Sequence, residues 1–145
     1  MNTAKTVSVR VVRRFKASPE RVFDAWLDPD KARRFLFATP TGKIVRANVD
    51  ARVGGGFVIV DRRDSEDIEH VGEYLEIVRP TRLKFTFRVP NYSAANSWVT
   101  LDIAPVDGGC ELTLTHEGVL AKYADKTPEG WGMIFDGLAA LLAGK

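Results

Sequence analysis

Two histidines and one cysteine are the side chains of this chain best suited to proton transfer, metal binding or nucleophilic attack. His116 follows Leu112 and Leu114 at a spacing of two, so in a β-strand the three side chains share one face. An inward-facing histidine there can bind a ligand carbonyl or act as a general base. We favour the simpler alternative, a structural histidine hydrogen-bonded to the backbone at the strand end. His70 begins a strand beside the acidic residues 64–69, and we expect it at the rim of a sheet.

The chain carries no motif that identifies a reaction. Its two histidines and Cys110 are too scattered for a structural zinc site, so we expect no metal. Residues 54–56 are glycines, but they lack the Lys-Ser/Thr pair of a phosphate-binding loop and precede a predicted strand. The Gly-x-Ser-x-Gly motif of α/β-hydrolases is absent from the sequence. We therefore predict no catalytic residue and no cofactor. A non-enzymatic protein is favoured, and the enzyme question stays open.

Aromatic side chains recur at apolar positions of the predicted strands and helices. Such residues usually form the core, because they bury a large apolar area. Several of them could instead line a cavity for an apolar ligand, in which a few polar groups give orientation. The candidate ligand-binding residues are Trp26, Phe35, Phe57, Tyr74, Phe85, His116, Trp131 and Phe135. Their spacing does not separate residues that line a cavity from residues that only pack.

The strand that follows His70 has two mixed faces. Glu73 lies on the same parity as several apolar residues, whereas Tyr74 lies on the other parity. Either side chain could therefore point into the interior. An inward-facing carboxylate would need a partner such as Arg13 or Arg88.

Alternating apolar and polar residues predict an antiparallel sheet that is covered on one side. The clearest segment is 70–87, two strands joined by a short connection at residues 78–82. We predict the other strands at residues 7–16, 43–49, 57–60, 98–103 and 112–117, with a polar turn at residues 62–67. Arg13 falls on the apolar side of the first strand, so a bulge or the strand end is expected near it.

Three helices are predicted between and after these strands. Ser18, Pro19 and Glu20 form a cap, first-turn and dipole signature for a helix that ends by residues 28–29. Asp30 is expected to cap a second short helix. The same signature recurs at residues 127–129, before a long C-terminal helix. Its apolar stripe consists of Trp131, Ile134, Phe135, Leu138, Leu141 and Leu142.

These elements predict one α+β domain over residues 1–145. A curved antiparallel sheet of about seven strands, with two short helices after the first strand, wraps around the C-terminal helix. The chain has 21 basic and 19 acidic residues, a net charge of +2, which gives no reason to expect a nucleic-acid partner. No run approaches the ~20 apolar residues of a membrane span, so we expect no membrane insertion. The single cysteine and the absence of a signal sequence predict a cytoplasmic location.

The sequence resembles the helix-grip (START-like, Bet v-like) superfamily, and within it the family of the activator of heat shock protein 90 ATPase. The matching segments are residues 17–23, 25–26, 28–29, 53–57, 70–74, 80–83, 112–116 and 130–131. Family members often have two adjacent aromatic residues, usually tryptophan, where this chain has Arg34-Phe35-Leu36-Phe37, so we expect a different pocket shape in that corner.

The resemblance implies binding of an apolar or amphipathic small molecule between the sheet and the C-terminal helix, in a carrier or sensor role. One alternative is a polyketide cyclase-like or other cavity enzyme, for which replacing His116 by alanine would abolish turnover. Another is a co-chaperone or regulatory protein-interaction module with a filled core. The chain begins directly at the first strand, without the separate N-terminal domain of the co-chaperone, which counts against a chaperone partner. A homodimer is a base-rate expectation.

Overall fold

The computed structural model describes residues 5–39 and 41–144. In this part of the chain one seven-stranded antiparallel sheet has the strand order β1-β7-β6-β5-β4-β3-β2. The strands are β1 (Thr6–Phe15), β2 (Lys43–Val49), β3 (Gly56–Arg63), β4 (Glu66–Val78), β5 (Arg82–Phe87), β6 (Ser97–Val106) and β7 (Gly109–Leu120). The helices are α1 (Pro19–Leu27), α2 (Pro29–Phe35) and α3 (Thr127–Leu142), and a short 3-10 helix η1 (Ala121–Tyr123) precedes α3.

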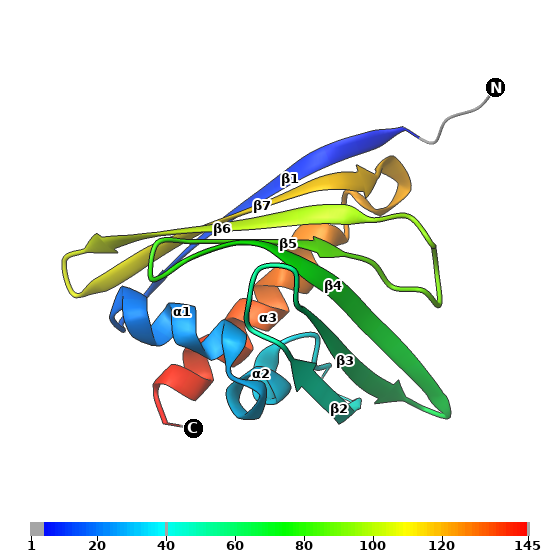
Figure 1. Cartoon of the computed structure of the whole chain (residues 1–145), viewed down its shortest axis with the longest axis horizontal. Coiled ribbons are helices and arrows are strands. Elements are labelled where there is room, and N and C mark those ends of the chain that lie inside the picture. Colours follow the sequence, from blue (N-terminus) through cyan, green and yellow to red (C-terminus); the bar gives the residue numbers. More distant parts are fainter. Residues whose placement is uncertain (1–4, 40, 145) are drawn as a thin grey trace.

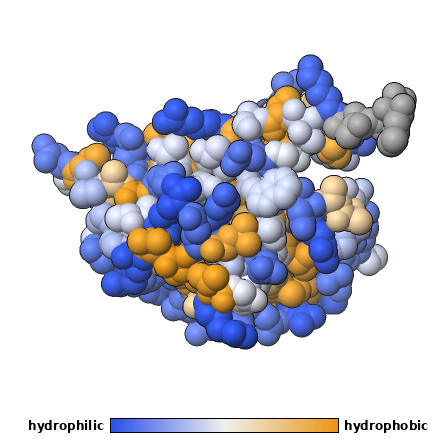
Figure 2. Space-filling model, turned by 45° about the horizontal axis from the view of Figure 1, so that its top comes forward, coloured by the Kyte–Doolittle hydropathy of each residue, from blue (hydrophilic) through white to orange (hydrophobic). Residues whose placement is uncertain are grey.

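All three α-helices lie on one side of the sheet, and the sheet curves around them (Figure 1). The long helix α3 crosses beneath the strands, while β2 and β3 curl down beside α2 (Figure 1). The ridge that leads to the N-terminus is mostly hydrophilic, and apolar residues gather in patches on the body below it (Figure 2). The predicted α+β helix-grip architecture is confirmed. Of the helices in the described ranges, none is long and apolar enough to span a bilayer.

The two short helices begin at side-chain caps. The Ser18 hydroxyl accepts a hydrogen bond from the Arg21 amide at 3.2 Å, as the sequence predicted for α1. The second cap differs from the prediction, because Asp28 and not Asp30 precedes α2. Its carboxylate accepts a hydrogen bond from the Asp30 amide at 2.9 Å. One residue therefore ends α1 and starts α2, with Pro29 in the first turn of α2.

Helix α3 begins without the predicted cap. Thr127 is its first residue, and the Thr127 hydroxyl donates to the carbonyl of Tyr123 in η1 at 2.9 Å. Lys126 precedes the helix and makes no side-chain capping bond. The predicted apolar stripe is otherwise correct: four of its residues are buried, and Leu141 and Leu142 are partly buried against the core.

Irregular pairing in two strands explains their mixed faces. In β2 a register shift between Ile44 and Arg46 brings Ile44 rather than Val45 against the core, with Ala47 and Val49. In β4 a shift follows Tyr74, whose side chain is buried, whereas Glu73 is exposed. The polar turn before β4 is also shorter than predicted. Strands β3 and β4 pair as far as Arg63 and Glu66, which leaves only residues 64–65 between them.

Arg13 faces inward without disturbing β1. Pairing with β7 is regular from Val9 to Phe15, and the bulge lies farther up, between Val7 and Val9. The Arg13 guanidinium binds Asp136 of α3 at 2.9 Å and lies over the Phe135 ring, 5.7 Å from its centroid. An arginine is tolerated on this apolar face because its charged end reaches a carboxylate at the edge of α3.

Candidate functional site

An apolar cavity of about 390 Å³ lies beneath the sheet beside the first turns of α3. Its walls come from residues 37–39 after α2, from β3, β4, β5 and β7, and from α3. A second hollow of about 600 Å³ shares Phe87, Val89, Tyr92, His116 and Thr127 with it, and extends along residues 88–98 toward η1. The two solvent-open hollows therefore adjoin each other between the β5–β6 loop and α3.

Only two of the predicted ligand-binding residues line this cavity, His116 and Trp131. Phe57 borders a separate hollow of about 690 Å³ with polar neighbours that include Asn48, Asp50 and Glu73.

The other five predicted residues are buried in the interior, and Phe35 among them also borders a third hollow of about 240 Å³ beside α3. These are Trp26, Phe35, Tyr74, Phe85 and Phe135, each at most 2 % exposed. Ring contacts join them at close range, for example 5.4 Å between the centroids of Trp26 and Phe35 and 6.3 Å between those of Tyr74 and Phe85. Because α1 and α2 press against this half of the sheet, these aromatic rings fill the space that they enclose.

Phe37 is a cavity residue that the sequence did not single out. Its ring stacks on His70 at 4.5 Å and on Phe87 at 4.9 Å, nearly parallel to both. Its backbone φ of 60° lies in the left-handed region, which costs a non-glycine residue about 1–2 kcal/mol. The sequence signal that could have identified Phe37 is its position two residues after Phe35, in the segment where family members often have two adjacent aromatic residues.

His116 is held by side chains on both ring nitrogens. The indole N–H of Trp131 donates to His116 Nδ1 at 3.1 Å, so Nδ1 carries no proton and Nε2 does. Nε2–H then donates to the Ser97 hydroxyl at 2.7 Å, and that hydroxyl donates to the Phe87 carbonyl at 3.0 Å. The prediction of an inward-facing histidine is correct, but its partners are side chains rather than the backbone.

Burial lowers the pKa of His116 to about 4, so the ring is neutral near pH 7. Its one lone pair already accepts a hydrogen bond from Trp131. A general base needs a free lone pair within reach of the substrate proton. In this arrangement His116 links α3 to β6 and β7, and has no free nitrogen for acid–base chemistry.

The prediction that His70 lies at the rim of the sheet is wrong, because its side chain is buried. Along β4, Ile68, His70 and Tyr74 share the inward parity. Nδ1 lies 3.2 Å from the Ile59 carbonyl, which can only accept, so Nδ1 carries the proton and Nε2 is left as an acceptor. Burial is the main cause that lowers the pKa of His70 to about 4. The cavity wall thus contains a neutral histidine with an available nitrogen.

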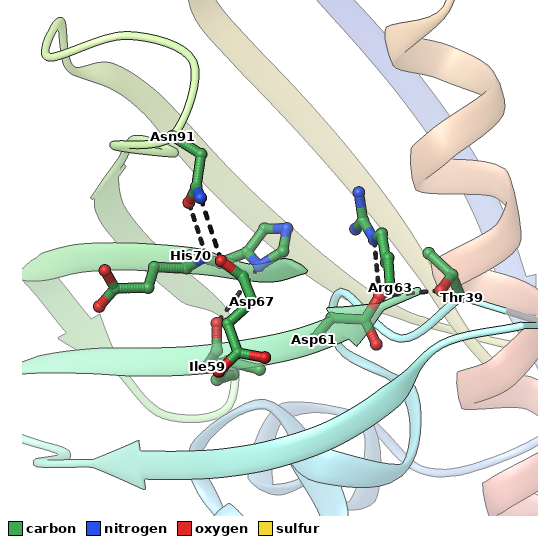
Figure 3. Close-up of polar contacts among 8 residues, drawn as sticks. Thr39, Ile59, Asp61, Arg63, Asp67, His70 and Asn91 are labelled. Carbon is green, nitrogen blue, oxygen red and sulfur yellow. Dashed lines mark hydrogen bonds and ion pairs between the residues drawn. The ribbon is translucent and has the colours of Figure 1, made fainter. Parts of the chain in front are cut away.

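Three polar side chains meet beside this histidine (Figure 3). Asp61 is fully buried, and its Oδ2 accepts from the Thr39 hydroxyl at 2.8 Å and from Arg63 Nε at 2.7 Å. Its Oδ1 is buried without a hydrogen-bond partner among the described residues. Arg63 and Thr39 line the cavity. None of the three was a predicted site residue, and Arg63 lies within residues 62–67, whose charged side chains are typical of a turn.

Asn91 ties the β5–β6 loop to β4. Its side-chain amide donates to the Asp67 carbonyl and accepts from the Glu69 amide, both at 3.0 Å (Figure 3). These bonds position the loop residues Val89 and Tyr92, which form the outer wall of the cavity. The loop is therefore a fixed wall at this point.

The fold and the cavity define a helix-grip domain with a hollow between its sheet and its last helix. The chain belongs to the Activator of Hsp90 ATPase homolog 1-like protein family, whose model matches residues 16–143. Comparison with curated proteins finds no match. This membership suggests a ligand-binding fold and specifies no ligand.

Solved structures of similar proteins support the fold. Protein CV1439 from Chromobacterium violaceum is 27% identical, with a TM-score of 0.84 over 93% of this chain and 96% of that one. A protein of unknown function from Staphylococcus aureus, SA2116, is 19% identical, with a TM-score of 0.87 over 97% and 96% of the two chains. Mll3558 from Rhizobium loti is 23% identical, with a TM-score of 0.80 over 96% and 99%.

Proposed function

We propose that this protein binds an apolar or amphipathic small molecule in the 390 Å³ cavity, as a carrier or a sensor. The observation that carries the proposal is the composition of the wall. Phe37, Phe87, Met133 and Ile134 supply apolar contacts, and a few polar groups converge at one part of it. Pockets for small molecules have this composition and volumes of roughly 300–1,000 Å³. Burying about 200 Å² of apolar ligand surface would contribute about 5 kcal/mol.

The open hollow favours this proposal over an interaction module with a filled core. A cavity enzyme needs a general acid or base, and His116 has both nitrogens engaged. Of the two histidines in the cavity wall, His70 is the one with an available nitrogen for such a role. We place the binding function in the cytoplasm, where Cys110, a buried free thiol, fits the reducing environment.

A thermal-shift screen against apolar and aromatic metabolites tests the proposal. A ligand at ~100 times its dissociation constant adds ~2.7 kcal/mol, which for this chain length raises the melting midpoint by roughly 5–10 °C. Gly130 lines the cavity, and a Cβ built on it meets no atom within 4 Å. We expect Gly130→Leu to fill part of the cavity and abolish the shift.

Gly132 provides the matched control. It lies one helical position beyond Trp131, its Cβ would also meet no atom within 4 Å, and it is not part of the cavity wall. Gly132→Leu should therefore leave the thermal shift intact. The proposal fails if no compound raises the midpoint, or if Gly130→Leu responds to every hit as the wild type does.

A further inference from the structure

We propose that the ligand carries a carboxyl group, which Arg63 and His70 bind together at the polar part of the cavity. This inference rests on the proposed function, because it names the chemical class of the ligand for the same cavity. It follows from the position of one arginine, the buried carboxylate that holds it and the available nitrogen of a neighbouring histidine.

Arg63 presents donors that the protein does not use. Its side chain is one-third exposed (33%) and lines the cavity, and its Nε is bound to Asp61. Within the described ranges its two terminal nitrogens donate to no protein acceptor. A guanidinium fixed at Nε keeps its outer N–H groups in a planar fork, which matches the two oxygens of a carboxylate.

Asp61 fixes the direction of that fork. A fully buried carboxylate is costly unless it is paired, and Asp61 has one oxygen bonded to Thr39 and Arg63 and one without a partner among the described residues. An apolar side chain at this position would avoid the cost. We therefore assign Asp61 as a positioning residue, which holds the Arg63 side chain against the cavity wall.

His70 stands on the same side of β3 and β4 as Arg63 (Figure 3). The two groups are near enough for the Arg63 charge to lower the pKa of His70 and for Asp61 to raise it. His70 Nε2 can only accept when the ring is neutral. A carboxylic acid fits this pair of neighbours, because its carbonyl oxygen accepts from Arg63 and its O–H donates to His70.

The charge balance links binding to one proton. The pair of Asp61 and Arg63 is neutral, so an added carboxylate leaves one uncompensated negative charge in a partly buried site. A proton shared between the ligand carboxyl group and His70 Nε2 restores neutrality, and this sharing requires the His70 ring. Tyr92 and His116 also face this space, and both ring nitrogens of His116 are engaged in hydrogen bonds. Ligand affinity should therefore rise as the pH falls.

Matched probes test the inference. Decanoate and 1-decanol share one apolar chain and differ in the head group, and binding is followed by calorimetry and by the intrinsic tryptophan fluorescence of the protein. At pH 6 we expect the wild type to bind decanoate about tenfold more tightly than decanol. The double variant Asp61→Asn/Arg63→Gln removes the pair without leaving a lone buried charge. It should lose the preference for decanoate and still bind decanol.

The control removes another ion pair from the same two strands. Arg62 and Asp67 are joined at 2.7 Å, are both partly exposed and lie outside the cavity. Arg62→Gln/Asp67→Asn should keep the tenfold preference.

Raising the pH from 6 to 8 should weaken decanoate binding by up to about tenfold per unit, and His70→Phe should remove this slope.

Each failure has a distinct meaning. Equal binding of decanoate and decanol by the wild type, or a preference that survives Asp61→Asn/Arg63→Gln, would overturn the carboxyl inference and leave the cavity proposal standing. A pH-independent affinity would overturn the role of His70. Absence of binding by both probes, together with a silent metabolite screen, would overturn the inference and the proposed function alike.

Discussion

The space beneath the sheet has two halves of opposite character. Under α1 and α2 it is filled by aromatic rings such as Trp26 and Phe135, whereas beside the first turns of α3 it is hollow. Both halves are rich in aromatic residues, so aromatic content does not distinguish them. The difference lies in the polar groups. Both buried histidines, together with Thr39 and Arg63, line the hollow half, and this half is the one suited to a ligand.

The two buried tryptophans show the same contrast at one atom. The indole nitrogen of Trp26 is buried in the packed half without a hydrogen-bond partner among the described residues. The indole nitrogen of Trp131 donates to His116 and so joins α3 to the sheet. Trp26 therefore contributes to the packed half only by filling space. Trp131 fills space at the cavity and also contributes a hydrogen bond from its indole N–H.

The largest expected effect comes from emptying the packed half. Phe135 is fully buried and contacts the rings of Phe15 and Trp26 at 6.0 and 6.4 Å. Phe135→Ala should lower the free energy of unfolding by about 3–5 kcal/mol, since it removes a buried ring and leaves a cavity. Met133→Ala, at a half-exposed position of the hollow half, should cost much less. Urea denaturation measures both, and equal losses would contradict the division.

Acid should lower the free energy of unfolding through the two histidines of the hollow half. Burial lowers the pKa of His70 and of His116 to about 4, below the ordinary value of 6.5. Between pH 4 and pH 6.5 the histidines of the unfolded chain bind protons that the folded protein does not bind. The stability that comes from keeping both histidines neutral is therefore present above pH 6.5 and is lost as the pH falls toward 4. From pH 6.5 to 5 each histidine should cost about 2 kcal/mol.

Unfolding in urea at a series of pH values tests this expectation. His70→Phe retains a ring against Phe37 and removes one titrating group, so the acid loss should fall by about half. An unchanged pH profile in this variant would show that His70 already has its ordinary pKa in the folded protein.

The smallest expected effect is the difference in stability between replacing Trp131 and replacing Trp26 by phenylalanine. Trp131→Phe leaves the buried Nδ1 of His116 without its donor and should cost about 1–3 kcal/mol. Trp26→Phe removes volume but also removes an unpaired N–H, so its net cost should stay below about 1 kcal/mol. The comparison is made by urea denaturation, with the His116 pKa followed by NMR. A larger loss for Trp26→Phe would reverse the assignment of roles.

Much of the fold could be predicted because alternation and helical spacing are local patterns. The sheet, the helix order and the stripe on α3 all follow from them. The caps were harder, because neighbouring residues compete for one role. Asp28 and Asp30 flank the same proline, and Pro29 occupies the first position of α2, which makes Asp28 the cap. Thr127 has a capping side chain, yet a nearby carbonyl in η1 takes its hydroxyl.

The site could be predicted only to its general location under α3. Parity identifies inward-facing residues, but whether an inward ring packs or lines a cavity depends on how closely the opposite layer approaches. Trp26 and Trp131 both face inward, and the position of α1 over the sheet determines that Trp26 is packed whereas Trp131 lines the cavity. His70, Asp61 and Arg63 were missed although their parity is inward, because acidic and basic neighbours at residues 62–69 suggested a solvent-exposed turn.

The start of α3 has a consequence for how a ligand reaches the cavity. Helix α1 begins at a serine cap, whereas α3 begins without a capping side chain and has glycines at positions 130 and 132. Each glycine costs about 1 kcal/mol of helix stability relative to alanine. We therefore expect residues 128–133 to open locally far more often than the whole domain unfolds. Amide hydrogen exchange should be faster there than over residues 138–141, and this transient fraying would widen the opening of a cavity that is already open to solvent.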